Sequence, residues 1–589
     1  MRGRIFVKSI FGKLNHYSID SLRRDFLSGT IVGVIAIPLG MAFAIASGVN
    51  PEYGIYTTII AGILISIIGG SKFQIAGPTG AFIPVLLGVV MTYGYTNLLI
   101  AGFMAGIMLF LMGIFKLGSL IKYIPRPVTI GFTSGIAVII FTGQVASFLG
   151  LTGIEKHEEF IANAKEIIIN INTVNLYSVL IAIICLVTIL VTPKWFPKIP
   201  GPLIGLLVST LIAAFIFPDK VATIGSAYGE IPSKLPSFIF PDVTLDTIIK
   251  LIQPAFVIAI LGGIESLLSA VVADGMSGTK HDSNRELIGQ GIANMVTPLF
   301  GGIPATGAIA RTATNIKNGA VTRMSGVIHG FVVLIVLLVF APYASHIPLA
   351  SMAPILMVVA WNMSERKSFA HVLQTKSSDS FILVTTFLLT VFANLTVAVE
   401  VGLVLAAILF VKRMSGLMTV AKVLPDQALG SKKVKSYVVN EGHDCPQISI
   451  FTIEGPLFFG AAQMFEQNIM TTINHRPKVL ILRMGKVPYM DTTGEATLTS
   501  IVSHFRQNGG KIIVSGLQPQ PMEVLIKTGL DLKIERENFF ERTGEAIDYA
   551  LTTLNYDKCI GCRHFAFEEC SHLSKPNTTE ITGKVKLQV

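Results

Sequence analysis

The stretch at residues 300–311 reads FGGIPATGAIAR, and it lies where a transmembrane helix is expected although glycine and proline interrupt it. A second interrupted stretch, GGSKFQIAGPTGAF, occupies residues 69–82. Each combines a Gly-Gly pair with a later Thr-Gly-Ala at which a helix can begin, and the two lie at matching places in two hydrophobic halves of the chain. Matched interruptions of this kind indicate the substrate site of a transporter.

A helix that begins inside the membrane directs unpaired N–H groups and the positive end of its dipole at one point. Two such ends that face each other would bind an anion. The alternative is that both stretches are ordinary turns between spans, because glycine is common in membrane helices. We favour the anion site, since the interruption occurs twice.

The composition indicates a membrane protein with a soluble part. The chain has 589 residues, a mean hydropathy of +0.65 and 14% charged residues, whereas soluble domains average about 25%. Most of this deficit lies before residue 414. The net charge of +10 concentrates in particular loops, and no aromatic–basic motif predicts a nucleic-acid partner. Residues 1–26 are basic without a long apolar core, so we expect a cytoplasmic segment and not a cleaved signal peptide.

Apolar runs predict fourteen spans between residues 27 and 413, given that a full crossing needs about 20 residues. The expected spans are 27–46, 53–69, 79–92, 98–115, 128–149, 176–192, 203–217, 254–273, 287–299, 307–317, 324–341, 347–361, 379–395 and 397–413. Seven spans per half is an odd number, which forces the two halves into inverted orientation. Lysine and arginine gather in the loops that face the cytoplasm if both termini are cytoplasmic. We therefore expect a multi-pass protein of the inner, cytoplasmic membrane.

A different pattern begins after the last span. We expect a linker at 414–434 and a small α/β domain at 435–555, because short β-type runs alternate there with helical ones. The expected strands are 447–455, 479–484 and 511–516, and the expected helices are 461–473, 491–507 and 521–530. Asp491 is the expected N-cap of the second helix.

The tail at 556–589 carries a cysteine-rich run, CIGCRHFAFEECSH. Its thiols and imidazoles could ligate zinc or an iron–sulfur cluster, since a C-x-x-C pair places two thiolates on one ion. The alternative is a reduced tail without metal. The expected ligands are Cys559, Cys562, Cys570 and His572, with His564 close by in sequence.

Longer motifs resemble the SulP family, the sulfate permease and prestin group of anion transporters. The resemblance covers about residues 20–555. It rests on IPLGMAFAIASGVNPEYGIYT (37–57), GPTGAF (77–82), GFTSGI (131–136), IESLLSAVVADGMSGTKHDSNRELIGQGIAN (264–294) and the opening stretch at 300–311. The soluble part resembles the STAS domain that follows this transporter, with Met490-Asp491-Thr492-Thr493-Gly494 in place of the family's signature.

This resemblance implies a fold like the uracil permease, with fourteen segments in two inverted repeats that form a core and a gate domain. It also implies a homodimer, elevator-type alternating access, and a ligand between the third and tenth segments. The residues at the matching positions are Thr79, Gly80, Ala81, Gly307, Ala308, Ile309, Ala310 and Arg311. Bicarbonate members of the family lack the arginine.

The resemblance also indicates a cation-coupling position. The bicarbonate members carry an aspartate on the eighth segment, and a threonine one turn later, for sodium. The residues here are Glu265 and Ser269, and Glu265 lies in a run that is apolar on every face. A carboxylate at that depth is usually functional or paired. The alternative is a salt bridge or hydrogen bond that fixes the eighth segment to the core, with Arg311 as the candidate partner. The position at which other members carry a glutamate or glutamine on the first segment is Leu39 here.

The expected function is secondary active uptake of a small anion, coupled to protons or sodium. The closest motif agreement is with the bacterial C4-dicarboxylate permease of the family, which favours succinate or fumarate beside sulfate as substrates. Alternatives are a bicarbonate transporter, an uncoupled exchanger or channel, and a sensor in which the STAS domain binds a cytosolic partner. Asp491, Thr492 and Thr493 are the expected regulatory residues, because related free-standing domains are phosphorylated there. The sequence contains no nucleotide loop and no activated nucleophile, so an enzyme and a required cofactor are not expected. Membrane lipid is the remaining expected partner.

Overall fold

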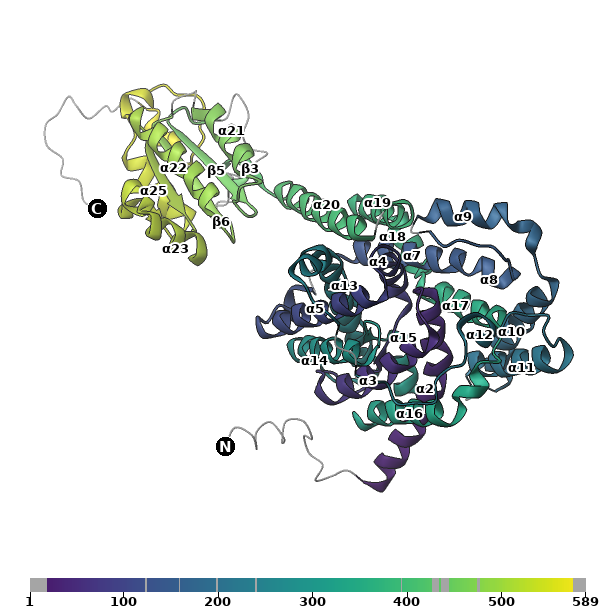
Figure 1. Ribbon diagram of the computed structural model, residues 1–589. Coiled ribbons are helices and arrows are strands. Elements are labelled where there is room, and N and C mark those ends of the chain that lie inside the picture. Colours follow the sequence, from purple (N-terminus) through teal and green to yellow (C-terminus); the bar gives the residue numbers. More distant parts are fainter. Residues whose placement is uncertain are drawn as a thin grey trace, which may run out of the picture. The chain divides into compact units, whose positions relative to one another are not determined.

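We describe a computed structural model of the chain (Figure 1). It describes residues 18–121, 124–157, 159–196, 200–238, 241–393, 395–425, 434–435, 444–473 and 477–575. The chain divides into two compact units, one ending at Ala406 and the other beginning at Ala407. The first unit is helical, and the second contains a six-stranded sheet.

Each of the fourteen expected spans corresponds to a helical segment. These are α2 (Ile19–Ala46), α3 (Pro51–Ile68), η2 with α4 (Gly80–Phe82, Ile83–Tyr93), α5 (Tyr95–Ile114), α7 with α8 (Arg126–Gly143, Val145–Leu149), α10 (Leu176–Trp195), α11 (Gly201–Ile216), α13 (Leu245–Ser277), α14 with η4 (Ser283–Val296, Thr297–Phe300), α15 (Ile309–Lys317), α16 (Met324–Ala344), α17 (Leu349–Met363), α19 (Ser378–Phe392) and α20 (Leu395–Ser415). Within the described part of the chain, seven helical segments of 18 residues or more are apolar enough to cross a membrane by length and composition. The helices that follow the two interruptions are shorter, as expected.

The helices of the first unit form two groups. In one group, α2 packs on α3 and α16, and α5 packs on α13 and α14. In the other, α7 packs on α17 and α19, and α10 packs on α11 and α17. These groups combine segments from both halves of the chain, which is the core-and-gate arrangement expected for inverted repeats. The 3₁₀ turn η2 contacts both α7 and α17 of the second group, so the first interruption lies at the boundary between the groups.

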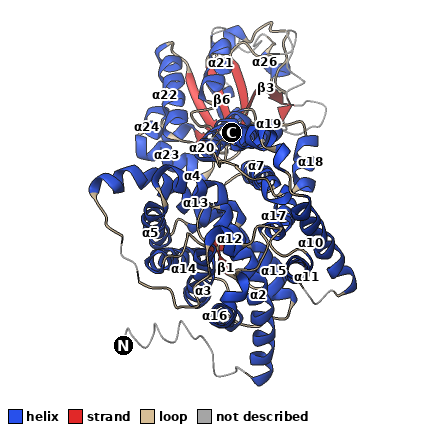
Figure 2. Cartoon of the chain, turned by 45° about the vertical axis from the view of Figure 1, so that its right-hand side comes forward, coloured by secondary structure: helices blue, strands red, loops and turns tan. Residues whose placement is uncertain are grey.

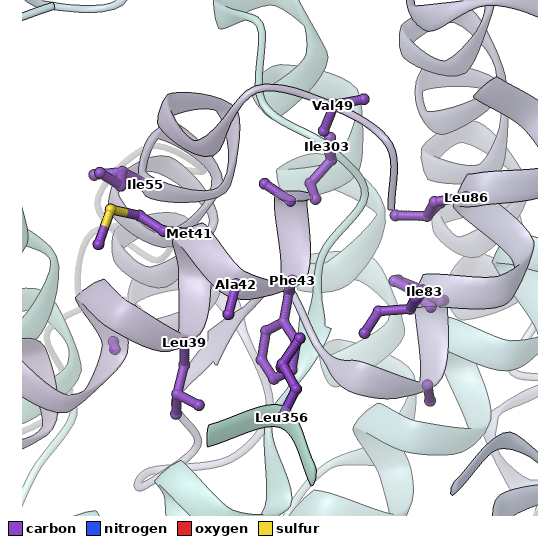
Figure 3. Close-up of a cluster of buried hydrophobic side chains, with 14 of the residues drawn as sticks. Leu39, Met41, Ala42, Phe43, Val49, Ile55, Ile83, Leu86, Ile303 and Leu356 are labelled. Carbon is purple, nitrogen blue, oxygen red and sulfur yellow. The ribbon is translucent and has the colours of Figure 1, made fainter. Parts of the chain in front are cut away.

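Small residues allow the helices to approach closely. Gly40 of α2 and Gly54 of α3 face each other so closely that a Cβ atom on Gly54 would lie 2.0 Å from the Gly40 carbonyl oxygen. Larger side chains fill the space around this crossing, and Leu39 is one of them (Figure 3). Figure 3 also shows Phe43 beside Leu356 of α17. The position that carries a polar side chain in some relatives is therefore part of the hydrophobic core here.

The second unit is an α/β domain whose strands lie in the order β4-β3-β5-β6-β7-β8. Strands β5 (Ile448–Glu454), β6 (Val479–Lys486), β7 (Lys511–Ser515) and β8 (Phe539–Phe540) are parallel, and β3 (Thr419–Pro425) pairs antiparallel with β5 and with β4 (Val434–Lys435). Alternate residues of β6 point to opposite faces: Leu480 and Leu482 pack under α21 (Ala462–Ile473) and α22 (Thr492–Gln507), whereas Val479 and Ile481 pack under α25 (Thr543–Thr552). α23 (Pro519–Thr528) joins the first of these faces (Figure 1).

Three expected boundaries need correction. The expected linker at 414–434 contains β3, which is a strand of the sheet, because its run TVAKVLP pairs residue by residue with β5. The first helix begins at Ile19 and not at 27, since Ser18 caps it by accepting a hydrogen bond from the Ser21 N–H. The tail is not separate from the domain, because Ala566 and Phe567 are buried in its core.

Candidate anion site

The two interrupted stretches meet in the middle of the first unit. Strand β1 (Ala76–Gly77) pairs antiparallel with β2 (Thr306–Gly307), with Ala76 opposite Gly307. Figure 2 shows β1 among the helices. A helical segment follows each strand: η2 and α4 follow β1, and α15 follows β2. The expected juxtaposition of the two interruptions is therefore present.

Polar side chains from neighbouring helices hold this strand pair. Asn294 of α14 donates its amide to the Ala305 carbonyl and accepts from the Ala305 N–H, both at 2.8 Å. The Thr306 hydroxyl donates to the Gly262 carbonyl of α13 at 2.9 Å and lies 2.9 Å from the Ser266 hydroxyl. Backbone groups that a broken helix leaves unpaired are thus satisfied inside the protein, as a membrane interior requires.

Thr79 connects the first interruption to Glu265. Its hydroxyl donates to Glu265 Oε2 at 2.7 Å, across 186 residues of sequence. Thr79 precedes η2 in the N-cap position, yet its side chain makes no capping hydrogen bond. Its hydroxyl is therefore committed to the carboxylate on α13 and not to its own helix. Glu265 is only partly buried, although Ser266 beside it is fully buried.

Arg311 lies in the first turns of α15 and is 3% exposed. Its Nη2 donates to the Pro78 carbonyl, and its Nη1 is buried without a hydrogen-bond partner. A Cβ atom on Gly77 would lie 2.6 Å from Nη1, so the guanidinium lies against the backbone of β1. No nitrogen–oxygen distance of 4.0 Å or less joins Arg311 to Glu265 in the described part of the chain, so the alternative salt bridge is not formed.

The other expected anion-site residues surround the same point. Gly80, Ala81, Gly307 and Ala308 are buried, whereas Ile309 and Ala310 are exposed at the start of α15. The Ala308 N–H, just before this turn, donates to the Ile75 carbonyl at 2.8 Å. A Cβ atom on Gly80 would lie 3.4 Å from both Ile140 Cδ1 of α7 and Met363 Sδ of α17, which places Gly80 against the second helix group.

Ser269 lies one turn after Glu265 and is fully buried. Its hydroxyl donates to Thr312 Oγ1 at 3.1 Å, and the same oxygen accepts from the Ile75 N–H at 3.0 Å. Ser269 therefore joins α13 to α15 and to the residue before β1. The structure does not place Ser269 in a hydrogen bond with Glu265 in the described part of the chain.

Sequence reasoning missed several buried polar groups near this point. Gln74 is 3% exposed and His329 of α16 is fully buried. Among the described residues, neither amide atom of Gln74 and neither ring nitrogen of His329 has a hydrogen-bond partner. A Cβ atom on Gly307 would lie 1.7 Å from Gln74 Nε2, so Gln74 lies against the β2 backbone. The signal in the sequence that could have revealed Gln74 and His329 is a polar residue within an apolar stretch.

Glu286 borders a charged loop in the sequence, so a solvated side chain is expected there, and that expectation is wrong. It is fully buried, and its Oε2 accepts from the N–H groups of Gly70 and Ser71 at 2.8 and 3.1 Å. Its Oε1 accepts from the Gln290 amide at 2.9 Å. The carboxylate thus fixes the start of the interrupted stretch at residues 69–82, because the turn there leaves backbone donors unpaired.

The expected regulatory residues lie at the start of α22. Asp491 is the N-cap, as predicted, and accepts from the Gly494 N–H at 2.8 Å and from the Phe459 N–H at 3.0 Å. Thr492 and Thr493 follow it and are exposed. Their hydroxyls are therefore accessible to a modifying enzyme.

The expected metal ligands of the tail do not form a single-ion site. Among the described residues, no three His, Cys, Asp or Glu side chains lie close enough together to bind one metal ion. Cys559, Cys562 and Cys570 line one cavity, whereas His572 is exposed and does not line it.

Comparisons with known proteins match both units. The family described as "Sulfate permease family" matches residues 22–386, and the family described as "STAS domain" matches residues 438–546. A Bacillus subtilis (strain 168) protein, provisionally named sulfate transporter YvdB, is 57% identical over 534 residues, which are 91% of this chain and 99% of that protein. The bicarbonate transporter BicA of Picosynechococcus sp. is 30% identical over 91% of this chain and 96% of its own length.

Solved structures agree with the fold. The inward-facing anion transporter Slc26a9 of mouse aligns with a TM-score of 0.85 at 19% identity, covering 94% of this chain and 95% of its own. The transmembrane domain of a cyanobacterial bicarbonate transporter, BicA, aligns with a TM-score of 0.60 at 32% identity, covering 65% of this chain and 98% of its own. The proteins named in these comparisons are transporters and not enzymes.

Proposed function

This chain belongs to the sulfate permease family, with a STAS domain after its membrane unit, and we propose that it is a proton-coupled transporter that takes up sulfate. The hydrogen bond between Thr79 and Glu265 carries the proposal. It joins the only hydroxyl among the proposed anion-site residues to the carboxylate of the proposed coupling position.

Coupling follows from the direction of this hydrogen bond. While Glu265 is ionised, Thr79 must donate its proton to the carboxylate and can offer only lone pairs to an anion. When Glu265 binds a proton, the carboxylic acid can donate to Thr79 instead, and the Thr79 hydroxyl becomes free to donate to the anion. Protonation also removes a negative charge beside the site. Proton and anion therefore each increase the affinity for the other, as linkage requires.

Arg311 supplies the fixed positive charge. One guanidinium nitrogen is used by the Pro78 carbonyl, and Nη1 is left without a partner. A guanidinium matches two oxygens of an oxyanion at once, which suits sulfate or a carboxylate. We propose that backbone N–H groups at the start of α15, which is a helix N-terminus, add a second set of donors.

Sulfate is the substrate we favour, because the relative that shares 57% identity over nearly its whole length carries that provisional name. Bicarbonate is the second candidate, because BicA covers most of both chains at 30% identity. Arg311 and Glu265 argue against it, since the bicarbonate members of the family lack the arginine and carry aspartate for sodium. Only the motif agreement in the sequence supports succinate or fumarate as the substrate.

The remaining expectations concern movement and assembly. We propose elevator-type alternating access, in which the helix group that contains both interruptions moves against the group formed by α7, α10, α11, α17 and α19. Gly80 lies at the boundary between the two helix groups. An anion bound beside Gly80 would therefore be carried along that boundary when the first group moves. We further propose a homodimer in the cytoplasmic membrane with both termini inside, and a STAS domain that is regulated through Thr492 or Thr493 by a cytosolic partner.

Uptake by the purified protein in lipid vesicles tests this function. Vesicles are given an inward proton gradient, an inward sodium gradient or none, together with labelled sulfate, bicarbonate or succinate. We expect saturable sulfate accumulation with the proton gradient. Accumulation of bicarbonate or succinate in preference to sulfate would contradict the proposal that sulfate is the substrate. Accumulation driven by the sodium gradient alone would contradict the proposal that the proton is the coupling ion.

A further inference from the structure

Four of the chain's five cysteines line one cavity in the second unit. Cys445 precedes β5, and Cys559, Cys562 and Cys570 come from the tail, more than a hundred residues later. The fifth cysteine, Cys185, is buried in α10 of the membrane unit. The cavity therefore combines thiols from two distant parts of the chain.

Gln447 brings the two parts together. Its amide donates to the Asn555 carbonyl at 3.0 Å and its carbonyl oxygen accepts from the Asn555 N–H at 3.0 Å, so the start of β5 is fastened to the start of the tail. The same amide lies 3.3 Å from Cys559 Sγ and donates to it. The approach of Cys445 to the tail thiols is thus built into the domain.

The C-x-x-C segment forms a tight turn. The Cys562 N–H donates to the Cys559 carbonyl at 3.0 Å, and Gly561 between them has a φ of +75°, which favours glycine. Cys570 Sγ accepts from the Phe567 N–H at 3.4 Å. Hydrogen bonds to cysteine sulfur are among the interactions by which proteins stabilise thiolate-bound clusters.

Apolar side chains form much of the rest of the wall, and Asp444, Lys558, His564 and Ser574 also line it. Leu554, Ala566 and Phe567 are buried there, and Leu573 packs beside them. The four cysteines of the cavity are each partly buried.

A single metal ion does not match this arrangement, because no three ligands in the described part of the chain converge on one point. In a four-iron iron–sulfur cluster each cysteine binds its own iron, so the thiols stand apart around a central body. We propose that Cys445, Cys559, Cys562 and Cys570 ligate an iron–sulfur cluster in the cavity between the β5 start and the tail. His572, the fourth ligand expected from sequence, takes no part.

Full-length protein purified without oxygen in detergent tests this proposal. We expect bound iron and acid-labile sulfide at about one sulfide per iron, with a visible charge-transfer absorption that reductant bleaches. Protein that is isolated without metal is treated with ferrous iron and sulfide before the same measurements. Zinc bound in place of iron, or failure to assemble a cluster under these conditions, would overturn the proposal.

One substitution tests the fourth ligand, and two others serve as controls. Cys445→Ser should lose most of the iron, sulfide and absorption, whereas Cys185→Ser and His572→Ala should retain them. Elution of Cys445→Ser as a single species and a wild-type unfolding midpoint of the second unit report that the domain is folded, because transport by the membrane unit would not. Full cluster content in Cys445→Ser would show that the fourth ligand lies elsewhere.

Discussion

Thr79 has a hydroxyl that can make only one donated hydrogen bond at a time. In the structure that bond goes to Glu265, and in the proposed anion-bound state it goes to the anion. The protonation state of Glu265 determines whether the Thr79 hydroxyl donates to Glu265 or to the anion. The side chains of Thr79 and Glu265 therefore account for the whole proposed coupling step, and a substitution that removes the hydroxyl alone should weaken both anion binding and its pH dependence.

Thr79→Val keeps the shape of the side chain and removes the hydroxyl. We expect sulfate affinity to fall about 10-fold or more, since a hydrogen bond to a charged group contributes about 1.5–3 kcal/mol. The increase in affinity at low pH should also weaken. Calorimetric titration at several pH values measures both effects. Thr79→Ser is the matched control and should restore them. Wild-type affinity and pH dependence in Thr79→Val would exclude the switch.

Arg311→Ala should abolish sulfate binding or weaken it severely while the protein remains folded. The guanidinium is the only cationic side chain among the proposed anion-site residues, and its Nη1 has no partner within the described residues. Arg311→Lys keeps the charge without the two-nitrogen geometry and should bind sulfate with intermediate affinity. Binding is measured by titration on samples that elute as a single species. An unchanged affinity in Arg311→Ala would remove the residue from the site.

Individual site residues differed in how well the sequence predicted them. Glu265 and Arg311 could be found because a charge within an apolar run is conspicuous, and the broken motifs located Thr79. Ser266, Thr312 and Asn294 could not, because small polar side chains occur throughout membrane helices and their role depends on which backbone group they meet across the fold. Glu286 was misjudged for the same reason: its partners, the Gly70 and Ser71 N–H groups, lie 215 residues or more away.

At the scale of elements, the apolar runs predicted the helices well because membrane spans must be long and apolar. The pairing of β1 with β2 was not predictable, since two residues per strand carry no periodic pattern. β3 was missed because TVAKVLP alternates weakly and follows a helix without a clear stop. Only its pairing with β5 makes it a strand.

Glycine contacts between helices give a test at this scale. Gly54→Ala should destabilise the membrane unit by about 1–3 kcal/mol, the usual cost of overpacking, because the added methyl would meet the Gly40 carbonyl. Gly275→Ala is the control, since nothing lies within 4 Å of a Cβ atom there. Thermal unfolding in detergent should show a lower midpoint for Gly54→Ala alone. Equal midpoints would contradict the close packing of α2 on α3.

At the scale of the whole molecule, we expect the two compact units to have separate functions. The proposed anion site uses only residues of the first unit. Removing residues 416–589 should therefore leave sulfate affinity unchanged, while expression or transport rate falls. The cut precedes β3, because a cut further along would leave an unpaired strand. Loss of sulfate binding by a well-folded membrane unit would show that the STAS domain contributes to the site.

Coupled uptake is the central claim, and Glu265→Gln tests it most directly. Glutamine keeps the size of the side chain but cannot exchange a proton, so the variant resembles the permanently protonated state. Vesicles that contain wild-type or variant protein are compared for sulfate accumulation under an inward proton gradient and for sulfate–sulfate exchange without one. We predict that Glu265→Gln retains exchange and loses gradient-driven accumulation. Accumulation at the wild-type level in Glu265→Gln would contradict the coupling role of Glu265.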